Sequence, residues 1–316
     1  MNEYRGKHAP KGPWAVAATA APSRRGKHQK RNRKRRIGAI IAACVLLLVL
    51  AWPFAEARFM LSTERTVIAS ADLPQDANHL RIVYLSDIHW GFWYSDGDAA
   101  GLINRINGLR PDLVLFGGDY ATDHASAVQF FHLVQALPDI RARYGVYGVI
   151  GETDCGETLF EQTQLRDAMT AANVIPLVNR TETIQIGSSR IIVAGLDDIT
   201  KGTPDLRSLA RSVSASDYVI FLAHNPSVIS DAQQATDRSG SLGWFDLGLF
   251  GHTHGGQMMY FSGMLEIAPD VPERYRSGWL TENRSTMLIS RGVGTSVVPM
   301  RLLCTPQIHL IELTSN

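Results

Sequence analysis

Side chains that can bind a metal ion follow five short apolar runs in this 316-residue sequence. Runs of this length and composition are typical of strands buried on both faces of a sheet. The segments that follow them are Asp87-Ile88-His89, Gly117-Gly118-Asp119, Gly151-Glu152-Thr153-Asp154, His224-Asn225-Pro226 and Gly251-His252-Thr253-His254-Gly255-Gly256. Because α/β proteins build their sites where strands end, the five segments together predict one shared site.

The candidate ligands are imidazoles and carboxylates, without a thiolate. This donor set suits Mn, Zn or Fe and disfavours Ca or a structural zinc site. A shared carboxylate can hold two such ions about 3.5–4 Å apart. Each segment alone has a structural alternative, such as a hydrogen-bonded core histidine at His224. The five in combination are what favour a metal centre.

Apolar runs and helical stripes alternate through the body of the chain. The predicted strands are 81–86, 112–116, 146–150, 190–195, 218–223, 246–250, 286–290 and 307–312, and the predicted helices are 98–109, 125–137, 159–172 and 205–212. The alternation in the first half predicts parallel pairing, and the strand-rich second half favours two sheets packed face to face with helices outside. We therefore expect a single α/β domain over residues 62–316.

Charge is divided sharply along the chain. Residues 1–36 contain 12 of the 31 Lys and Arg residues and one of the 30 acidic residues, which makes this segment +11 and the rest −10. A 45% hydrophobic content excludes wholesale disorder. Residues 1–36 are predicted to be a disordered basic tail. The acidic body, and a tail with few aromatic residues, argue against nucleic acid as a partner.

Residues 37–54 are free of charge and long enough, at about 27 Å as a helix, to cross a hydrocarbon core. We predict a transmembrane anchor over residues 37–57, with Trp52 and Phe54 at the interface. The positive-inside rule places the tail in the cytoplasm and the body in the periplasm or outside the cell, on an inner or plasma membrane. A cleaved signal peptide is the alternative, because Ala55-Glu56-Ala57 resembles a cleavage site.

The five segments, in this order and spacing, resemble those of the calcineurin-like metallophosphoesterases over about residues 80–313. The block Ser290–Ser296, followed by Pro299 and Arg301, looks like the membrane-associated bacterial phosphodiesterase branch. The resemblance implies a β-sandwich of two mixed sheets flanked by helices. It also implies two divalent metal ions (Mn, Zn or Fe). The implied ligands are Asp87, His89 and His254 for one ion, His224 and His252 for the other, and Asp119 for both.

The segment 151–154 departs from the family's Gly-Asn-His-Asp. Glu152 can still bind a metal through oxygen, whereas Thr153 cannot act as a general acid near pH 7. His124 is a candidate replacement for that acid or a surface residue, and Arg291 is a candidate phosphate ligand or a surface ion pair. We take the candidate catalytic residues to be Asp119, Thr153, Asp154 and Arg291.

Two minor candidates are set aside. Asp123 is at most a neighbour of the ligands, and Cys155 lacks a base partner for nucleophilic catalysis.

The leading hypothesis is a membrane-anchored dinuclear phosphoesterase that acts on phosphodiester or pyrophosphate bonds of lipid or envelope compounds. The alternative is a metal-binding envelope protein that has lost turnover.

Overall fold

The computed structural model describes residues 24–214, 216–258 and 267–315. By its internal contacts the chain divides into two compact units, residues 1–50 and 51–316. Helix α1 (Arg24–Phe59) begins within the segment predicted to be a disordered tail, while residues 1–23 lie outside the described residues. Its part Arg31–Phe59 is long and apolar enough to cross a membrane, judged by length and composition.

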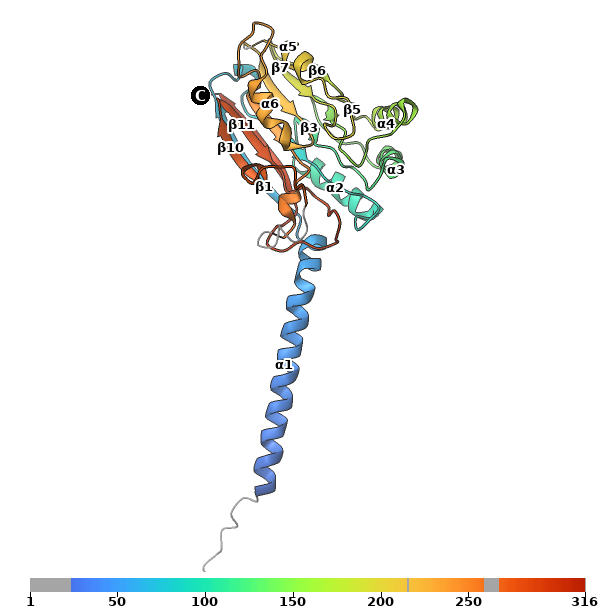
Figure 1. Cartoon of the computed structure of the whole chain (residues 1–316), viewed down its shortest axis with the longest axis vertical. Helices are drawn as coiled ribbons and strands as arrows, with labels where there is room; N and C mark the ends of the chain where they lie inside the picture. Colours follow the sequence, from blue (N-terminus) through green and yellow to red (C-terminus); the bar gives the residue numbers. More distant parts are fainter. Residues whose placement is uncertain (1–23, 215, 259–266, 316) are drawn as a thin grey trace, which may run out of the picture. The chain divides into compact units, whose positions relative to one another are not determined.

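Two six-stranded sheets form the body (Figure 1). The first has the order β1 (Ser62–Ser70), β12 (Gln307–Ser315), β2 (Leu80–Leu85), β3 (Leu113–Phe116), β4 (Val146–Gly148) and β5 (Ile175–Pro176). The second has the order β10 (Gly278–Glu282), β11 (Ser285–Ile289), β9 (Leu247–Phe250), β8 (Tyr218–Leu222), β7 (Ser189–Gly195) and β6 (Arg180–Ile186). Strands β2 to β5 are parallel, as are β7, β8, β9 and β11, and the remaining pairs include antiparallel ones.

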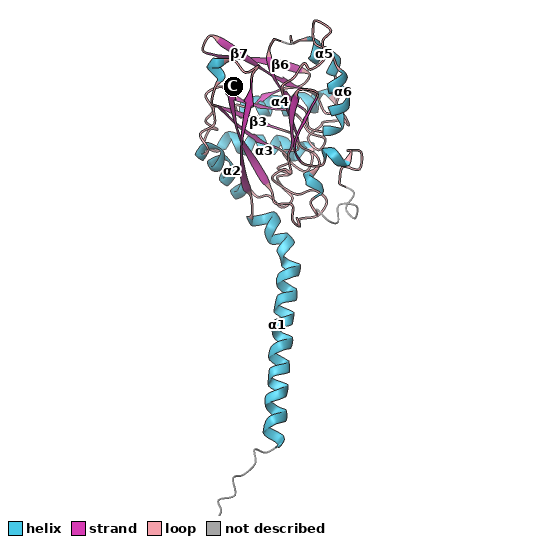
Figure 2. Cartoon of the chain, turned by 90° about the vertical axis from the view of Figure 1, so that its left-hand side faces the viewer, coloured by secondary structure: helices cyan, strands magenta, loops and turns pink. Residues whose placement is uncertain are grey.

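Helices cover the outer face of each sheet (Figure 2). Besides α1, the helices are α2 (Asp96–Gly108), α3 (His124–Ala136), α4 (Leu159–Ala171), α5 (Leu206–Arg211) and α6 (Ile229–Gln234), with 3-10 turns η1 (Gln75–Ala77), η2 (Pro226–Val228), η3 (His254–Gly256) and η4 (Glu273–Tyr275). The first sheet packs on α2, α3 and α4, and the second on α5 and α6. The mixed sheets and flanking helices confirm the predicted fold.

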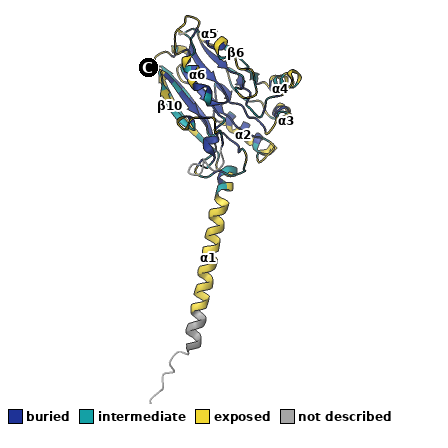
Figure 3. Cartoon of the chain, viewed as in Figure 1, coloured by how far each residue is buried: buried dark blue, intermediate teal, exposed yellow. Residues whose placement is uncertain are grey.

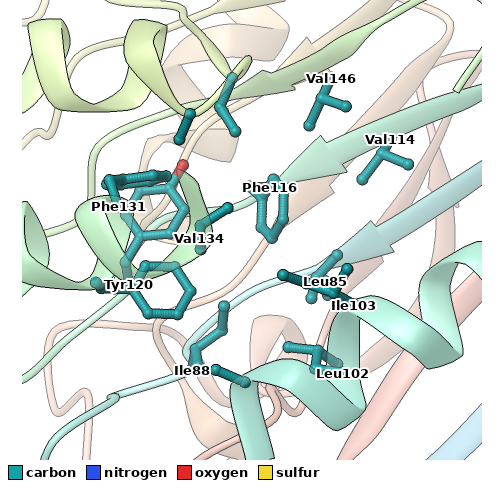
Figure 4. Packing of buried hydrophobic residues seen from close by; sticks show 14 of the residues in the cluster. Leu85, Ile88, Leu102, Ile103, Val114, Phe116, Tyr120, Phe131, Val134 and Val146 are labelled. Atoms are coloured by element: carbon teal, nitrogen blue, oxygen red, sulfur yellow. The ribbon is translucent and has the colours of Figure 1, made fainter. Parts of the chain in front are cut away.

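Three apolar clusters hold these layers together. Between the sheets lie residues such as Ile82, Leu115 and Ile220, all fully buried. Under α2 and α3, Phe116 and Tyr120 pack against Phe131 (Figure 4). The strands are accordingly buried along most of their length (Figure 3).

All eight predicted strands and all four predicted helices are present, with shifts of a few residues at their ends. The prediction missed β1, β5, β6 and β10, and helix α6. Strands β1 and β10 are edge strands in which no residue is fully buried, so they lack the apolar run that reveals a buried strand.

Candidate metal centre

The predicted ligands come together because the strands that carry them end at one edge. Asp87 and His89 follow β2, and Asp119 follows β3 in the first sheet. His224 follows β8, and His254 lies beyond β9 in the second sheet. These five side chains are buried, with at most 4% of each residue exposed. Polar groups this deeply buried need partners, which makes their mutual geometry decisive.

Two groups of side chains could hold a metal ion. Asp87, His89 and His254 form one group, and Asp87, Asp119 and His224 form the other. In each group the potential ligand atoms lie within 4.8 Å of one another. Asp87 therefore belongs to both groups, whereas the resemblance to the family implied sharing through Asp119.

His89 and His254 place their Nε2 atoms close to one another. Nε2 of His89 lies 3.0 Å from Nε2 of His254. Two nitrogens each about 2.1 Å from one ion, at a right angle, would be separated by about 3.0 Å. The two imidazoles thus fit one ion between them.

His224 supports the second position. Its Nδ1 donates a hydrogen bond to the carbonyl oxygen of Gly117 at 2.8 Å, which leaves Nε2 with a lone pair in the neutral ring. That Nε2 is buried without a hydrogen bond, although Oδ2 of Asp119 lies 3.3 Å away. When the ring is neutral, this nitrogen and the carboxylate oxygen are both acceptors, and a proton or a metal ion between them satisfies both.

The charges of the site favour a cation as well. Burial lowers the pKa of His89 and, with help from Arg301 and His89, that of His254, so both rings are neutral and able to bind metal. Burial alone would raise the pKa of Asp119, but His224 and His89 lower it below its usual value. Asp119 in turn raises the pKa of His224 against the effect of burial. The ionised carboxylate of Asp119 therefore favours a positive charge next to His224, either on the ring or on a bound cation.

The backbone at the site adopts a conformation that is rare for residues other than glycine. Positive φ values are found at Asp87 (54°), His89 (47°), Asp119 (54°), His252 (67°) and His254 (50°). Each such residue costs on the order of 1 kcal/mol or more, and strain of this kind concentrates at functional sites. Gly118 and Gly151 are needed nearby, because a Cβ on Gly118 would lie 2.7 Å from the nitrogen of Gly151.

A cleft of about 440 Å³ opens over the metal groups. Its lining residues are Asp119, Glu152, Thr153, Thr200, His252, His254, Ile267–Asp270, Ser296 and Val297. His252 and Glu152 lie outside the two metal groups found among the described residues, although both face this cleft. Glu152 also approaches Lys201, with 4.0 Å between Oε1 and Nζ.

The turn at residues 151–154 is held mainly by backbone contacts. Thr153 donates its hydroxyl to the carbonyl of Ala121 at 2.7 Å, and its backbone nitrogen donates to Oδ1 of Asp119 at 2.9 Å. Asp154 is fully buried and accepts hydrogen bonds from the backbone nitrogens of Tyr120 and Gly151. Burial and the nearby Asp119 raise the pKa of Asp154. These contacts let Asp154 position the turn.

The remaining candidates lie away from the cleft. Asp123 caps α3 by accepting from the nitrogen of Ser126, and His124 donates from Nδ1 to the carbonyl of Asp154. Burial and surrounding carboxylates raise the pKa of Cys155, which keeps its thiol protonated. Arg291 packs close to Gly255, where an added Cβ would lie 2.9 Å from its Cγ.

Several residues that support the site were not predicted to do so, although Arg301 was noted as part of the family resemblance. Asp270 approaches His252, with 3.7 Å between Oδ1 and Nε2. Arg301 is fully buried and donates to backbone carbonyls around Gly294, while its Nη2 lies 3.3 Å from Nδ1 of His254. Cys304 contacts the carbonyl of His254 through Sγ at 3.1 Å.

Glu56, near the end of α1, supports the same region. It is 2% exposed and accepts hydrogen bonds from the backbone nitrogens of Leu303 and Cys304, each at 2.9 Å, and from the hydroxyl of Thr305. The last turns of α1 therefore brace the loop that holds Arg301 and Cys304 behind His254.

Comparison with known proteins agrees with the fold and the site. The sequence profile of the calcineurin-like phosphoesterases matches residues 80–256, so this chain belongs to that family. Its match to the metallophosphoesterase YkuE of Bacillus subtilis is 28% identical and covers 81% of this chain and 87% of the relative. The family thus identifies a phosphoesterase that carries two groups of potential metal ligands.

Other relatives have names that mention a membrane. A "transmembrane protein with metallophosphoesterase domain" from Bos taurus is 30% identical over 73% of this chain, which spans about half (52%) of that relative.

Among solved structures, the sulfate thiohydrolase SoxB of Thermus thermophilus is 13% identical to this chain and has a TM-score of 0.44. The match covers 76% of this chain and 57% of SoxB.

Proposed function

We propose that this protein is a membrane-anchored, dinuclear metal-dependent phosphoesterase. Its substrates would carry phosphodiester or pyrophosphate bonds in lipid or envelope compounds. The observation that carries the proposal is the buried cluster of Asp87, His89, Asp119, His224 and His254, with free imidazole nitrogens facing one another and a carboxylate. His252 and Glu152 would complete the ligand set from the cleft wall.

Two bound divalent ions would supply Lewis-acid polarisation of phosphoryl oxygens and a nucleophilic water at neutral pH. The protein holds the ligands in place through strained backbone and through the bonds of Asp154, Arg301 and Gly117. Substrate would enter the cleft between Glu152 and Val297.

Thr153 would provide little proton assistance to the leaving group, because its hydroxyl is committed to the carbonyl of Ala121. The enzyme is therefore expected to prefer leaving groups of low pKa, such as nitrophenolate or a nucleotide phosphate. Alkoxide leaving groups should react slowly, since loss of a general acid costs about 10²–10⁴-fold in rate.

The proposed anchor is uncleaved, with the N-terminal tail in the cytoplasm and the body on the other side of the membrane. Cleavage after Ala57 would remove Glu56, whose carboxylate accepts three hydrogen bonds inside the body. Buried backbone nitrogens left without acceptors would cost about 1–3 kcal/mol each. Recovery of mature protein that begins near Arg58 would contradict this part of the proposal.

The full-length protein in detergent should hydrolyse bis-p-nitrophenyl phosphate when supplied with Mn, Zn or Fe after chelation. A parallel metal analysis should find about two ions per chain. Fewer than one ion per chain would refute the dinuclear centre.

A second candidate function is metal binding without turnover. Glu152 and Thr153, in place of the family's Asn and His, favour it, because Glu152 approaches Lys201 and Thr153 bonds to backbone. Two bound ions with no hydrolysis of any diester or pyrophosphate would make this function the better account.

A further inference from the structure

Large apolar side chains are exposed around the end of α1. We call this set the apolar rim, and each of its residues is between 39% and 79% exposed. The rim consists of Trp52, Phe54, Phe59, Met60, Phe92, Trp93, Val297 and Leu303. Contiguous exposed apolar surface on a protein marks a place of interaction.

Contacts within the body hold the segments of the rim together. The nitrogen of Leu303 donates to Glu56, and the nitrogen of Arg301 donates to the carbonyl of Pro53, each at 2.9 Å. Arg58 pairs with Asp98 at 2.6 Å and lines a groove with residues 90–97. The loop that carries Phe92 and Trp93, the loop at residues 301–305 and the last turns of α1 therefore form one surface.

The rim lies at the same edge of the sheet as the metal centre. Strand β1 starts at Ser62, opposite Gln307 of β12, and β12 runs antiparallel to β2 with His309 opposite Tyr84. The chain therefore enters β1 at the level where β2 gives way to Asp87. Val297 belongs both to the rim and to the wall of the metal cleft.

We propose that the apolar rim docks on the lipid bilayer that α1 enters, so that the metal cleft opens at the depth of the lipid headgroups. This inference rests on the anchored phosphoesterase proposed above and specifies how its site meets a substrate. A phosphoryl group at the membrane surface would reach the cleft without its lipid leaving the bilayer.

Three observations favour a bilayer as the occupant of the rim. The uncharged stretch of α1 ends at Ala55, directly before the buried Glu56, so the bilayer that α1 enters must end beside the rim. Five of the eight rim residues are Trp or Phe. Two of them are Trp, a residue that concentrates at membrane interfaces. The chain after residue 36 has a net charge of −10, so contact with an anionic surface has to be apolar.

The opposite edge of the body offers a matched comparison. Leu242 is 65% exposed and precedes β9, whose far end carries His252 and His254. Leu303 of the rim is 52% exposed. Tryptophans introduced at Leu303 and at Leu242 therefore report on opposite edges of the same domain.

The test reconstitutes the full-length protein in phosphatidylcholine vesicles with or without brominated acyl chains, which quench tryptophan fluorescence at the membrane. Trp93→Phe should remove as much quenched signal as Trp52→Phe, within about twofold. Leu303→Trp should add quenched fluorescence, and Leu242→Trp should add fluorescence that bromine does not reach. The unfolding temperature of each variant in detergent controls for folding.

If Trp52→Phe removed the quenched signal and Trp93→Phe left it unchanged, Trp52 alone would contact lipid. That result would overturn the proposal, because the rim would then face water or another protein. Quenching at Leu242→Trp equal to that at Leu303→Trp would overturn it too. Hydrolysis of bis-p-nitrophenyl phosphate by the same samples separates the two proposals. Quenching without turnover would refute the catalytic function and support docking, whereas turnover without quenching at Trp93 would refute docking alone.

Discussion

The loop at residues 251–257 and the turn at residues 151–154 both follow buried parallel strands into one cleft, but they are held differently. The loop rests on Arg301 and Cys304, which Glu56 of α1 braces from behind. The turn is held by its neighbours in the same sheet, through Asp154, the side chain of Asp119 and the backbone nitrogen of Tyr120.

This difference explains why one segment matches the family and the other departs from it. His254 sits in a buried setting in which Arg301 lies beside the ring and Cys304 beside the backbone, so another side chain would leave polar groups unsatisfied. Glu152 and Thr153 are only half-buried and line the open cleft, so a change of side chain there disturbs less of the buried structure. The turn can therefore change its chemistry while Asp154 preserves its shape.

Replacing the buried carboxylate that lies against the turn and two of the histidines should have the largest effect. Asp119 faces His89 and His224 and accepts from the nitrogen of Thr153. Asp119→Asn is expected to lower diester hydrolysis by about 10³-fold or more and to reduce bound metal below two ions, because a buried negative charge among the metal ligands is lost. Metal analysis and initial rates provide the measurement. Asp123→Asn is the control, since Asn still caps α3, and an equal loss there would contradict the assignment.

The next largest effect should come from removing the brace behind the loop at residues 251–257. Glu56→Ala leaves two backbone nitrogens without their acceptor, at a cost of about 2–4 kcal/mol in the free energy of unfolding. Denaturation of the full-length protein in detergent measures this loss. Glu64→Ala removes an exposed carboxylate that bonds only to Ser62 in the described residues, and should change stability little. Similar losses in both variants would show that Glu56 has no special role.

A smaller effect is expected from restoring an acid to the turn. Thr153→His should raise the rate about 10–100-fold for alkyl leaving groups and less for nitrophenyl ones, because only poor leaving groups need a proton. Thr153→Asn, which cannot titrate, serves as the control. Equal gains on both kinds of substrate would mean that another residue already supplies the proton.

The smallest effect concerns the second departure in the turn. If Glu152 contributes an oxygen ligand, Glu152→Gln should weaken Mn binding by about tenfold, because a neutral amide is the poorer ligand for a hard ion. Equilibrium titration with Mn measures the change. Lys201→Gln is the matched control, because it removes the neighbouring charge and keeps the carboxylate. Unchanged Mn affinity in Glu152→Gln would mean that Glu152 lines the cleft without binding the metal.

The sequence by itself determined where most strands end and therefore which side chains are candidate ligands. An apolar run followed by Asp, His or Gly is a local signal, and parallel strands must end together, so Asp87, Asp119 and His224 could be assigned to one site. The sharing of Asp87 between both metal groups was not predicted, because it depends on side-chain directions across two sheets.

Only the tertiary structure decided what supports those ligands. Glu56 reads as part of a possible cleavage site, and Arg301 and Asp270 lie in irregular segments without periodic pattern. Their partners are up to 249 residues away, as for Glu56 and Thr305. Periodicity reports which face of an element is buried, whereas contacts between irregular segments arise only when the sheets have packed and brought those segments to one edge.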